Sequence, residues 1–250
     1  LMVFQGFRWR HLVEAGQKPG NPVFVALMLV GGAITNVIPG RPGDVARGIW
    51  LARISRIPVA RSLTSVGVDR SMDVVTIFVL LLISLPFVAK PDWLVNLVIV
   101  TGVLTLAAAA TLAAAWWYTN RSAGGLARKG LARTDRSWVR HQLSGIIRGL
   151  SVLSRPRDFG AALGLSAIGW GCAIFAGWLV ASAVGIHLNA ASIIFVIGVI
   201  SLGSAIPSSP GMIGTYQWLA VTSMAVVGVG GADALAFSVL SQATWYIPVT

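Results

Sequence analysis

Two Pro/Gly-rich segments of the chain match one another when one is shifted by 168 positions. Each follows an apolar run of 17 residues and leads into a further helical stretch. Seven residues are identical in the fifteen aligned columns: Ile38, Pro39, Pro42, Gly43, Trp50, Leu51 and Ala52, against Ile206, Pro207, Pro210, Gly211, Trp218, Leu219 and Ala220. Paired Gly/Pro interruptions in two halves are typical of a transporter substrate site. The alternative is two unrelated loops built from the same few residue types, but the matching Trp-Leu-Ala lies outside the loop.

The composition is that of a membrane protein. Only 11% of the 250 residues are charged, 56% are hydrophobic, and the mean hydropathy is +0.79. Soluble globular domains carry about 25% charged residues, so we predict an all-α polytopic membrane protein. The net charge of +11 is explained by the positive-inside rule and by anionic lipids, so no nucleic-acid partner is expected. Cys172 is the only cysteine, which excludes an internal disulfide and a Cys-rich metal site.

Apolar runs predict long helices at 62–89, 94–117 and 159–184, and shorter ones at 22–38 and 190–206. A run of 17 residues is short for a helix that crosses the hydrocarbon core. We therefore expect each short run to dip into the membrane, turn at its Pro/Gly segment and return as a second half-helix. Irregular backbone at that depth requires a covering of protein or a water-filled cavity. The predicted fold is a helical bundle with two re-entrant half-helix units.

The distribution of basic residues supports this topology. Residues 1–20, 41–61 and 120–158 hold three, five and nine Lys or Arg, which together are 17 of the 19 in the chain. If both units are re-entrant, these three segments lie on one side, as the positive-inside rule requires. Three spans then separate the two units, which enter from opposite faces as an inverted repeat. Residues 120–158 predict a basic amphipathic linker on the cytoplasmic surface between the halves.

Further expectations concern the extent and packing of the chain. We expect residues 1–250 to form one transmembrane domain, and the start at Leu1-Met2 and the end within an apolar run suggest a fragment of a longer protein. Aromatic residues beside basic ones in the first 20 residues suit a membrane interface. Gly160 and Gly164, four positions apart, predict a close-packing helix face.

The first Pro/Gly unit has the residues of an anion site. Gly40 and Gly43 let a ligand approach the main chain, and a half-helix that begins near Gly43 or Gly211 directs its N-terminal amides at the ligand. Arg41 and Arg47 add full charges, and arginine binds phosphate through two parallel hydrogen bonds. Asp44 either caps its half-helix or pairs with Arg47. The alternative for both arginines is that they only set the topology.

A second group of charged residues begins the helix at 62–89. Asp69 and Asp73 are four positions apart and share a helix face, with Arg70 beside them. Ionisable residues at that depth are costly unless they are paired or line a cavity. Two compatible interpretations remain: a ligand site, or an ion pair with Arg61 or Arg47 that joins two helices.

The second Pro/Gly unit is nearly uncharged. It offers hydroxyl groups from Ser208, Ser209 and Tyr216 and the amide of Gln217, and such a pair of units suits binding a headgroup from one side and releasing it to the other. Catalytic signatures such as Gly-x-Ser-x-Gly, His-Glu-x-x-His and a Walker loop are missing from the sequence. We therefore expect a binding or transport protein rather than an enzyme.

The order of these motifs resembles the lysylphosphatidylglycerol synthase transmembrane, or flippase-like, family. The matching elements are Phe7-Arg-Trp-Arg10, Asn36 with Pro39-Gly-Arg-x-Gly-Asp44 and Arg47, Asp69-Arg70-x-x-Asp73, and Pro207-x-x-Pro-Gly-x-x-Gly214. The resemblance covers nearly the whole chain. It implies a multi-spanning protein of the bacterial or archaeal inner membrane associated with moving lipids, either aminoacylated phosphatidylglycerol or polyprenol-linked sugars.

The sequence also departs from the family pattern. Some members carry a cytosolic aminoacyl-transferase domain, and these 250 residues hold no trace of one. The family often has glutamate where Gln217 stands, so a proton-coupled role at that position is in doubt, whereas Asp44 keeps the charge of a common glutamate. A first span before Phe7 is missing, which agrees with a truncated N-terminus.

We therefore predict that the chain binds and translocates an anionic or phosphate-bearing lipid headgroup, without a metal or other cofactor. Its expected partners are membrane lipids and a lipid synthase or glycosyltransferase. The alternative is a membrane anchor that presents lipid to such an enzyme, and a structural scaffold is a third interpretation. The predicted substrate-binding residues are Asn36, Pro39, Gly40, Arg41, Gly43, Asp44, Arg47, Arg53, Asp69, Arg70, Asp73, Pro207, Ser208, Ser209, Pro210, Gly211, Gly214, Tyr216 and Gln217.

Overall fold

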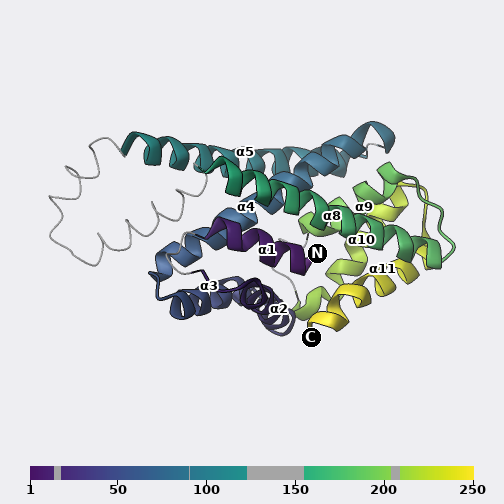
Figure 1. Ribbon diagram of the computed structural model, residues 1–250. Helices are drawn as coiled ribbons and strands as arrows, with labels where there is room; N and C mark the ends of the chain where they lie inside the picture. Colours follow the sequence, from purple (N-terminus) through teal and green to yellow (C-terminus); the bar gives the residue numbers. More distant parts are fainter. Residues whose placement is uncertain (14–17, 90, 123–154, 204–208) are drawn as a thin grey trace.

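The computed structural model describes residues 1–13, 18–89, 91–122, 155–203 and 209–250, and all regular secondary structure within these ranges is helical (Figure 1). The helices are α1 (Met2–Leu12), α2 (Asn21–Val37), α3 (Pro42–Ser55), α4 (Val59–Ser84), η1 (Leu85–Phe87), α5 (Asp92–Ser122), α8 (Pro156–Ala183), α9 (Ala190–Gly203), η4 (Pro210–Met212), α10 (Thr215–Val226), α11 (Gly231–Tyr246) and η5 (Ile247–Val249). The predicted all-α fold is confirmed. Most of the predicted linker at 120–158 lies outside the described residues.

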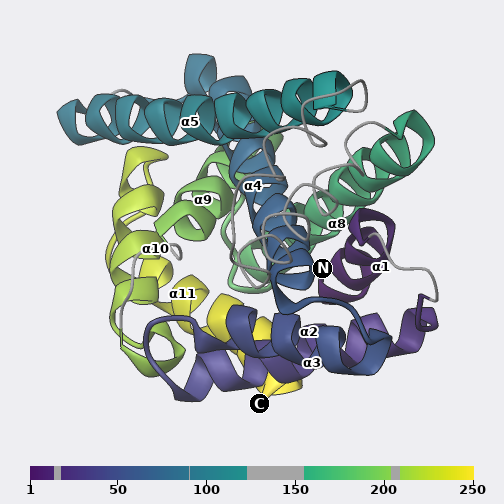
Figure 2. The ribbon, with the colours of Figure 1, turned by 90° about the vertical axis from the view of Figure 1, so that its left-hand side faces the viewer.

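Helix α4 lies at the centre of the molecule and packs against α1, α3, α5, α8 and α9 (Figure 2). The buried side chains of its first half include Asp69 and Asp73, and those of its second half include Ile77 and Leu81. Pro86 follows in η1, because proline lacks the amide hydrogen that would continue the helix. Helix α4 therefore places carboxylates in the middle of a bundle that is otherwise mostly apolar.

Helices α2 and α3 pack side by side as a hairpin that turns at the first Pro/Gly segment (Figure 2). Gly40 and Arg41 have left-handed backbone angles (φ 85° and 59°), and Pro42 begins α3. The two helices approach most closely at Gly31 and Gly43, since a Cβ atom on Gly43 would lie 1.8 Å from the carbonyl oxygen of Gly31. The glycine of the repeated motif is therefore required by backbone packing.

Helices α9 and α10 also pack together, around the second Pro/Gly segment. The described part of this turn holds η4 and two glycines with left-handed angles, Gly211 (φ 63°) and Gly214 (φ 87°). Element η4 packs against α2. The two Pro/Gly turns, which are 168 positions apart in the chain, therefore meet in space.

Helix α1 differs from the interfacial segment expected at the N-terminus. Trp9 is fully buried and Arg8 is 1% exposed. The indole of Trp9 donates to Ser65 Oγ (3.0 Å) and stands edge-on to the ring of Phe24. The expectation was wrong because α4 supplies a hydroxyl and carboxylates that satisfy these two side chains inside the protein.

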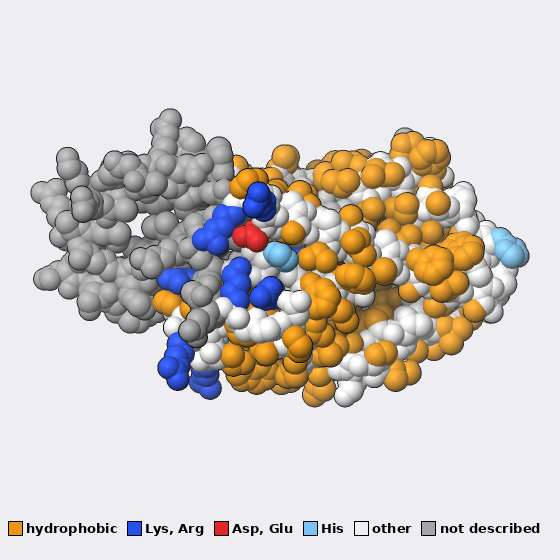
Figure 3. All heavy atoms as spheres, in the orientation of Figure 1, with side chains coloured by type: hydrophobic (Ala, Val, Ile, Leu, Met, Phe, Trp, Pro, Cys, Tyr) orange, Lys and Arg blue, Asp and Glu red, His pale blue; other side chains and the backbone are white. Residues whose placement is uncertain are grey.

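The outer surface is apolar over α5, α8 and α11, and Lys and Arg side chains gather at one end of the face shown in Figure 3. At that end α3 and α5 finish and α4 and α8 begin (Figure 1). Among the described helices, α8 alone is long and apolar enough to cross a membrane on length and composition, and α2 and α9 are shorter apolar helices. The number of crossings and the re-entrant path therefore stay predictions.

The close-packing face expected on α8 was wrong. Both Gly160 and Gly164 are exposed, and a Cβ atom at either position would meet nothing within 4 Å. The glycine of α8 that does pack closely is Gly177, against the side chain of Ile197.

Candidate functional site

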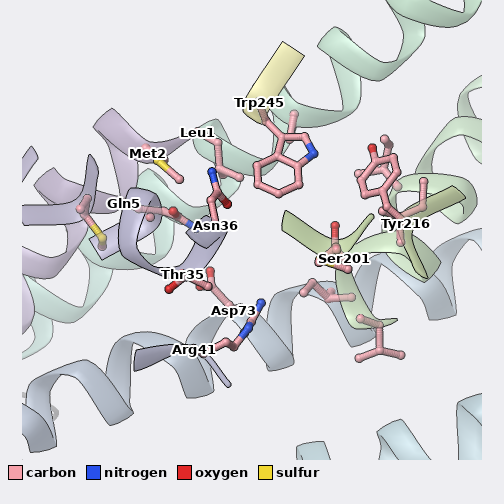
Figure 4. Close-up of a pocket in the computed structure, with 18 of the residues that line it drawn as sticks. Leu1, Met2, Gln5, Thr35, Asn36, Arg41, Asp73, Ser201, Tyr216 and Trp245 are labelled. Atoms are coloured by element: carbon pink, nitrogen blue, oxygen red, sulfur yellow. The ribbon is translucent and has the colours of Figure 1, made fainter. Parts of the chain in front are cut away.

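A cavity of about 650 Å³ lies between the two Pro/Gly turns (Figure 4). Pro39, Gly40 and Arg41 of the first turn line it, as do Gly211 and Met212 of the second. Side chains of α1, α2, α4, α8, α9 and α11 complete the wall. The repeated sequence motifs therefore build one shared site.

One wall of the cavity is charged. Arg70 of α4 makes a two-pronged ion pair with Asp44 of α3, with Nη2 2.6 Å from Oδ1 and Nε 3.0 Å from Oδ2. Arg70 also reaches Asp73 (3.4 Å), and its side chain is 40% exposed. Arg47 donates from Nε to Asp44 (3.1 Å). Asp44 therefore pairs with Arg47, one of the two roles expected for it, and the structure shows no side-chain cap on α3.

Behind this wall lies a fully buried layer of ion pairs. Arg8 of α1 binds Asp69 (2.7 Å) and Asp73 (2.7 Å) and donates to Ser166 Oγ of α8 (2.8 Å). Arg47 binds the second oxygen of Asp69 (3.1 Å). The six residues Arg8, Asp44, Arg47, Asp69, Arg70 and Asp73 thus form one charged cluster that joins α1, α3 and α4.

The charged cluster is electrically balanced, since it contains three guanidinium groups and three carboxylates. Arg41 lines the same wall of the cavity and gives this region a surplus of one positive charge. Arg47 is further enclosed by Trp9, whose ring centre lies 4.7 Å from the guanidinium carbon, and its side chain is 1% exposed. The arginines therefore divide into two enclosed ones, Arg8 and Arg47, and two that face the cavity, Arg41 and Arg70.

The opposite wall is uncharged and comes from the second half of the chain. Ser201, Tyr216 and Trp245 face Thr35, Asn36 and Arg41 across the cavity (Figure 4). The hydroxyl groups of Tyr216 and Ser241 are 2.7 Å apart. Between the polar walls the lining is apolar, from residues such as Ile197 and Ile200. The cavity thus combines a cationic region, hydroxyl groups and an apolar surface, which suits an amphiphilic anion.

The order of the charged motifs along the chain, now placed around one cavity, agrees with the comparison with known families. The model of the family described as "Lysylphosphatidylglycerol synthase TM region" matches residues 1–250. The chain belongs to this family. It is therefore a membrane domain with a role connected to lipids. No curated protein and no solved structure matches the chain significantly.

This member of the lysylphosphatidylglycerol synthase TM family uses Gln217 to hold its second turn. The side-chain oxygen of Gln217 accepts from the amide of Gly214 (2.7 Å), and its NH₂ group donates to the side-chain oxygen of Gln242. Gln242 in turn donates to the carbonyl oxygen of Gly211 (2.7 Å). Gln217 is not a cavity-lining residue, so its observed contacts are those of a structural brace.

The residues predicted from the sequence fall into three groups. Those that line the cavity are Asn36, Pro39, Gly40, Arg41, Asp44, Arg47, Arg70, Asp73, Ser209, Gly211 and Tyr216. Those that lie outside the lining are Gly43, Arg53, Asp69, Pro210, Gly214 and Gln217. Pro207 and Ser208 lie outside the described residues. Within the second group Asp69 belongs to the charged cluster, whereas Arg53 is exposed on α3.

Sequence reasoning missed Arg8 and the contribution of α11. Arg8 belongs to the Phe7-Arg-Trp-Arg10 motif, which was a signal for a special role, but its partners lie 61, 65 and 158 positions away. Ser241, Thr244 and Trp245 of α11 line the cavity, and no pattern in the sequence marks them. Among the described residues no group of three or more His, Cys, Asp or Glu is placed to hold a metal ion.

Proposed function

We propose that this chain binds the phosphate-bearing headgroup of an anionic membrane lipid in the cavity and moves it across the membrane. The observation that carries the proposal is that both Pro/Gly turns line one cavity whose exposed cations are Arg41 and Arg70. A guanidinium group binds two phosphate oxygens at once. Arg70 already holds the two oxygens of Asp44 in this manner, and a phosphate can take their place.

The surroundings of the charged wall favour a lipid over a free phosphate ion. The lining between the polar walls is apolar, and the outer surface of the bundle is covered with exposed aliphatic side chains. A lipid headgroup can therefore bind the arginines while its chain remains in apolar surroundings. The proposed location is the inner membrane of a bacterium or archaeon.

The lengths of the paired helices support a re-entrant path. Helices α2, α3, α9 and α10 contain 17, 14, 14 and 12 residues. At about 1.5 Å per residue they measure roughly 18–26 Å, whereas the hydrocarbon core is about 30 Å thick. Each hairpin thus suits a path that enters, turns at the cavity and returns. Alternating exposure of a site between two such units is the usual basis of transport.

A scrambling assay in proteoliposomes tests the proposal. The lipids are fluorescent phosphatidylglycerol, its lysyl ester and a polyprenyl phosphate, and the proteins are the wild type, Arg41→Gln and the matched control Arg53→Gln. A charged hydrogen bond contributes about 1.5–3 kcal/mol, so we expect Arg41→Gln to slow transport of the true substrate by about 10- to 100-fold. Arg53 is exposed and outside the cavity lining, and we expect its variant to stay within about twofold of wild type.

The outcomes separate transport from the membrane-anchor alternative. Binding of a lipid without movement, in protein that stays folded, would favour an anchor that presents lipid to a synthase or glycosyltransferase. Equal transport by the wild type and Arg41→Gln would refute the assigned headgroup site. Arg47→Ala is a poor probe of transport, because Arg47 is enclosed by Asp44, Asp69 and Trp9 and its loss disturbs the fold.

A further inference from the structure

Trp170 of α8 lines the cavity with an unsatisfied hydrogen-bond donor. Its side chain is 5% exposed, and its indole N–H has no partner among the described residues. Three other buried side-chain atoms of the described chain share this property, on Ser55, Arg61 and Thr105. None of those three residues lines the cavity. The unsatisfied donor of Trp170 is therefore the one that a bound molecule can reach.

A buried donor without a partner is unfavourable, because the group has lost its hydrogen bond to water. Trp9 shows the ordinary solution, since its indole donates to Ser65. Trp170 instead belongs to the apolar core cluster, with Ile197 and Ile200 among its members. A buried water needs two to four polar partners, and these apolar neighbours offer none. An acceptor atom of a ligand would supply the missing bond.

The face of α8 that holds Trp170 passes from polar to apolar. Ser166, one turn before Trp170, accepts from Arg8 of the charged cluster. Ala173 and Gly177, one and two turns after it, line the cavity with no polar side chain. At about 1.5 Å per residue the step from Ser166 to Trp170 is about 6 Å. Trp170 thus stands between the region that suits an anion and the region that suits a hydrocarbon chain.

We propose that Trp170 is a specificity-determining residue that donates a hydrogen bond to the ester carbonyl of a bound acyl lipid. In an ester-linked glycerolipid the carbonyl group lies between the phosphate and the hydrocarbon chain, in the same order as the residues along α8. An ether-linked lipid has the same headgroup and chain but lacks this acceptor. The inference rests on the proposed function in one respect, that the cavity holds a lipid.

The test compares binding of diester and diether phosphatidylglycerol with matched chains to wild type, Trp170→Phe and the control Trp178→Phe. Trp178 lies on the same helix, but it is 41% exposed and stacks on Phe175. Satisfying a buried donor is worth about 1–3 kcal/mol, so we expect the wild type and Trp178→Phe to prefer the diester by about tenfold. For Trp170→Phe we expect a ratio near one. The ratio is taken within each protein, so a general loss of packing in Trp170→Phe cancels.

Each outcome bears on one of the two proposals. A diester preference that persists in Trp170→Phe, or equal binding of both lipids by wild type, would overturn the role of Trp170 while lipid binding itself stands. Failure of either lipid to bind folded wild-type protein, or binding that Arg41→Gln leaves unchanged, would instead refute the headgroup site of the proposed function. Loss of the preference in Trp170→Phe alone would support the inference.

Discussion

At the scale of single residues, the interior of this protein is held by charges that cannot be removed one at a time. Arg8 is 1% exposed and is the only residue of α1 in the charged cluster, where it serves two carboxylates. Two ions inside a protein are costly to bury, and removal of one partner leaves the other uncompensated. The cluster therefore fixes how α1, α3 and α4 are assembled, and it keeps Asp44 and Arg70 in place at the cavity wall.

The first prediction follows for Arg8→Ala. Loss of the guanidinium group leaves Asp69 and Asp73 short of a partner, so we expect the free energy of unfolding to fall by about 3–5 kcal/mol. Unfolding in a detergent titration measures it. Arg10→Ala is the control, because Arg10 is half-buried and donates only to the carbonyl oxygen of Pro19, and its loss should cost about 1 kcal/mol. Adding Asp69→Asn to Arg8→Ala should restore part of the loss, and equal effects of Arg8→Ala and Arg10→Ala would contradict the argument.

At the scale of helices, the first hairpin depends on contact between two backbones. A Cβ atom on Gly43 would overlap the carbonyl oxygen of Gly31 at 1.8 Å, whereas one on Gly31 would lie 3.0 Å from the carbonyl oxygen of Gly43. A carbonyl in a helix cannot rotate away as a side chain can. The spacing of α2 and α3, and with it the position of Arg41 at the end of the hairpin, is thus set by these glycines.

We therefore predict that Gly43→Ala forces α2 and α3 apart and destabilises the protein by at least about 3 kcal/mol, the upper end of ordinary overpacking. Thermal unfolding in detergent measures the effect. Gly164→Ala on α8 is the matched control, since its added methyl group meets nothing within 4 Å, and alanine favours the helix by up to about 1 kcal/mol. If Gly43→Ala melts with the wild type, the close approach of the two helices does not exist.

The helices were predictable from the sequence to a greater extent than the site. Apolar runs placed α4, α5 and α8 within a few residues because burial of apolar side chains decides where such helices form. The shared cavity was predictable from the Pro/Gly repeat. The burial of Arg8 was not, because an arginine beside a tryptophan has the same pattern at a membrane interface as in a charged core. The difference depends on Asp69, Asp73 and Ser166, which only the tertiary fold brings to it.

At the scale of the whole molecule, the charge distribution and the order of the helices together define an orientation. The basic end contains the end of α3 and the starts of α4 and α8, while the connection between α8 and α9 lies at the opposite end (Figure 1). Segments rich in Lys and Arg remain on the cytoplasmic side of a membrane. The basic end should therefore face the cytoplasm, and the connection that carries His187 should face the other side.

Labelling of single cysteines tests this orientation in the native membrane. Cys172→Ser removes the only cysteine, and Arg56→Cys or His187→Cys then adds one at an exposed position at either end. We expect an impermeant maleimide to label position 187 in intact cells and position 56 only in inverted vesicles. Labelling of both positions from the same side would contradict an odd number of crossings between them. It would also remove the inverted relation of the two hairpins, because the hairpins enter from opposite faces only if these two ends are separated by the membrane.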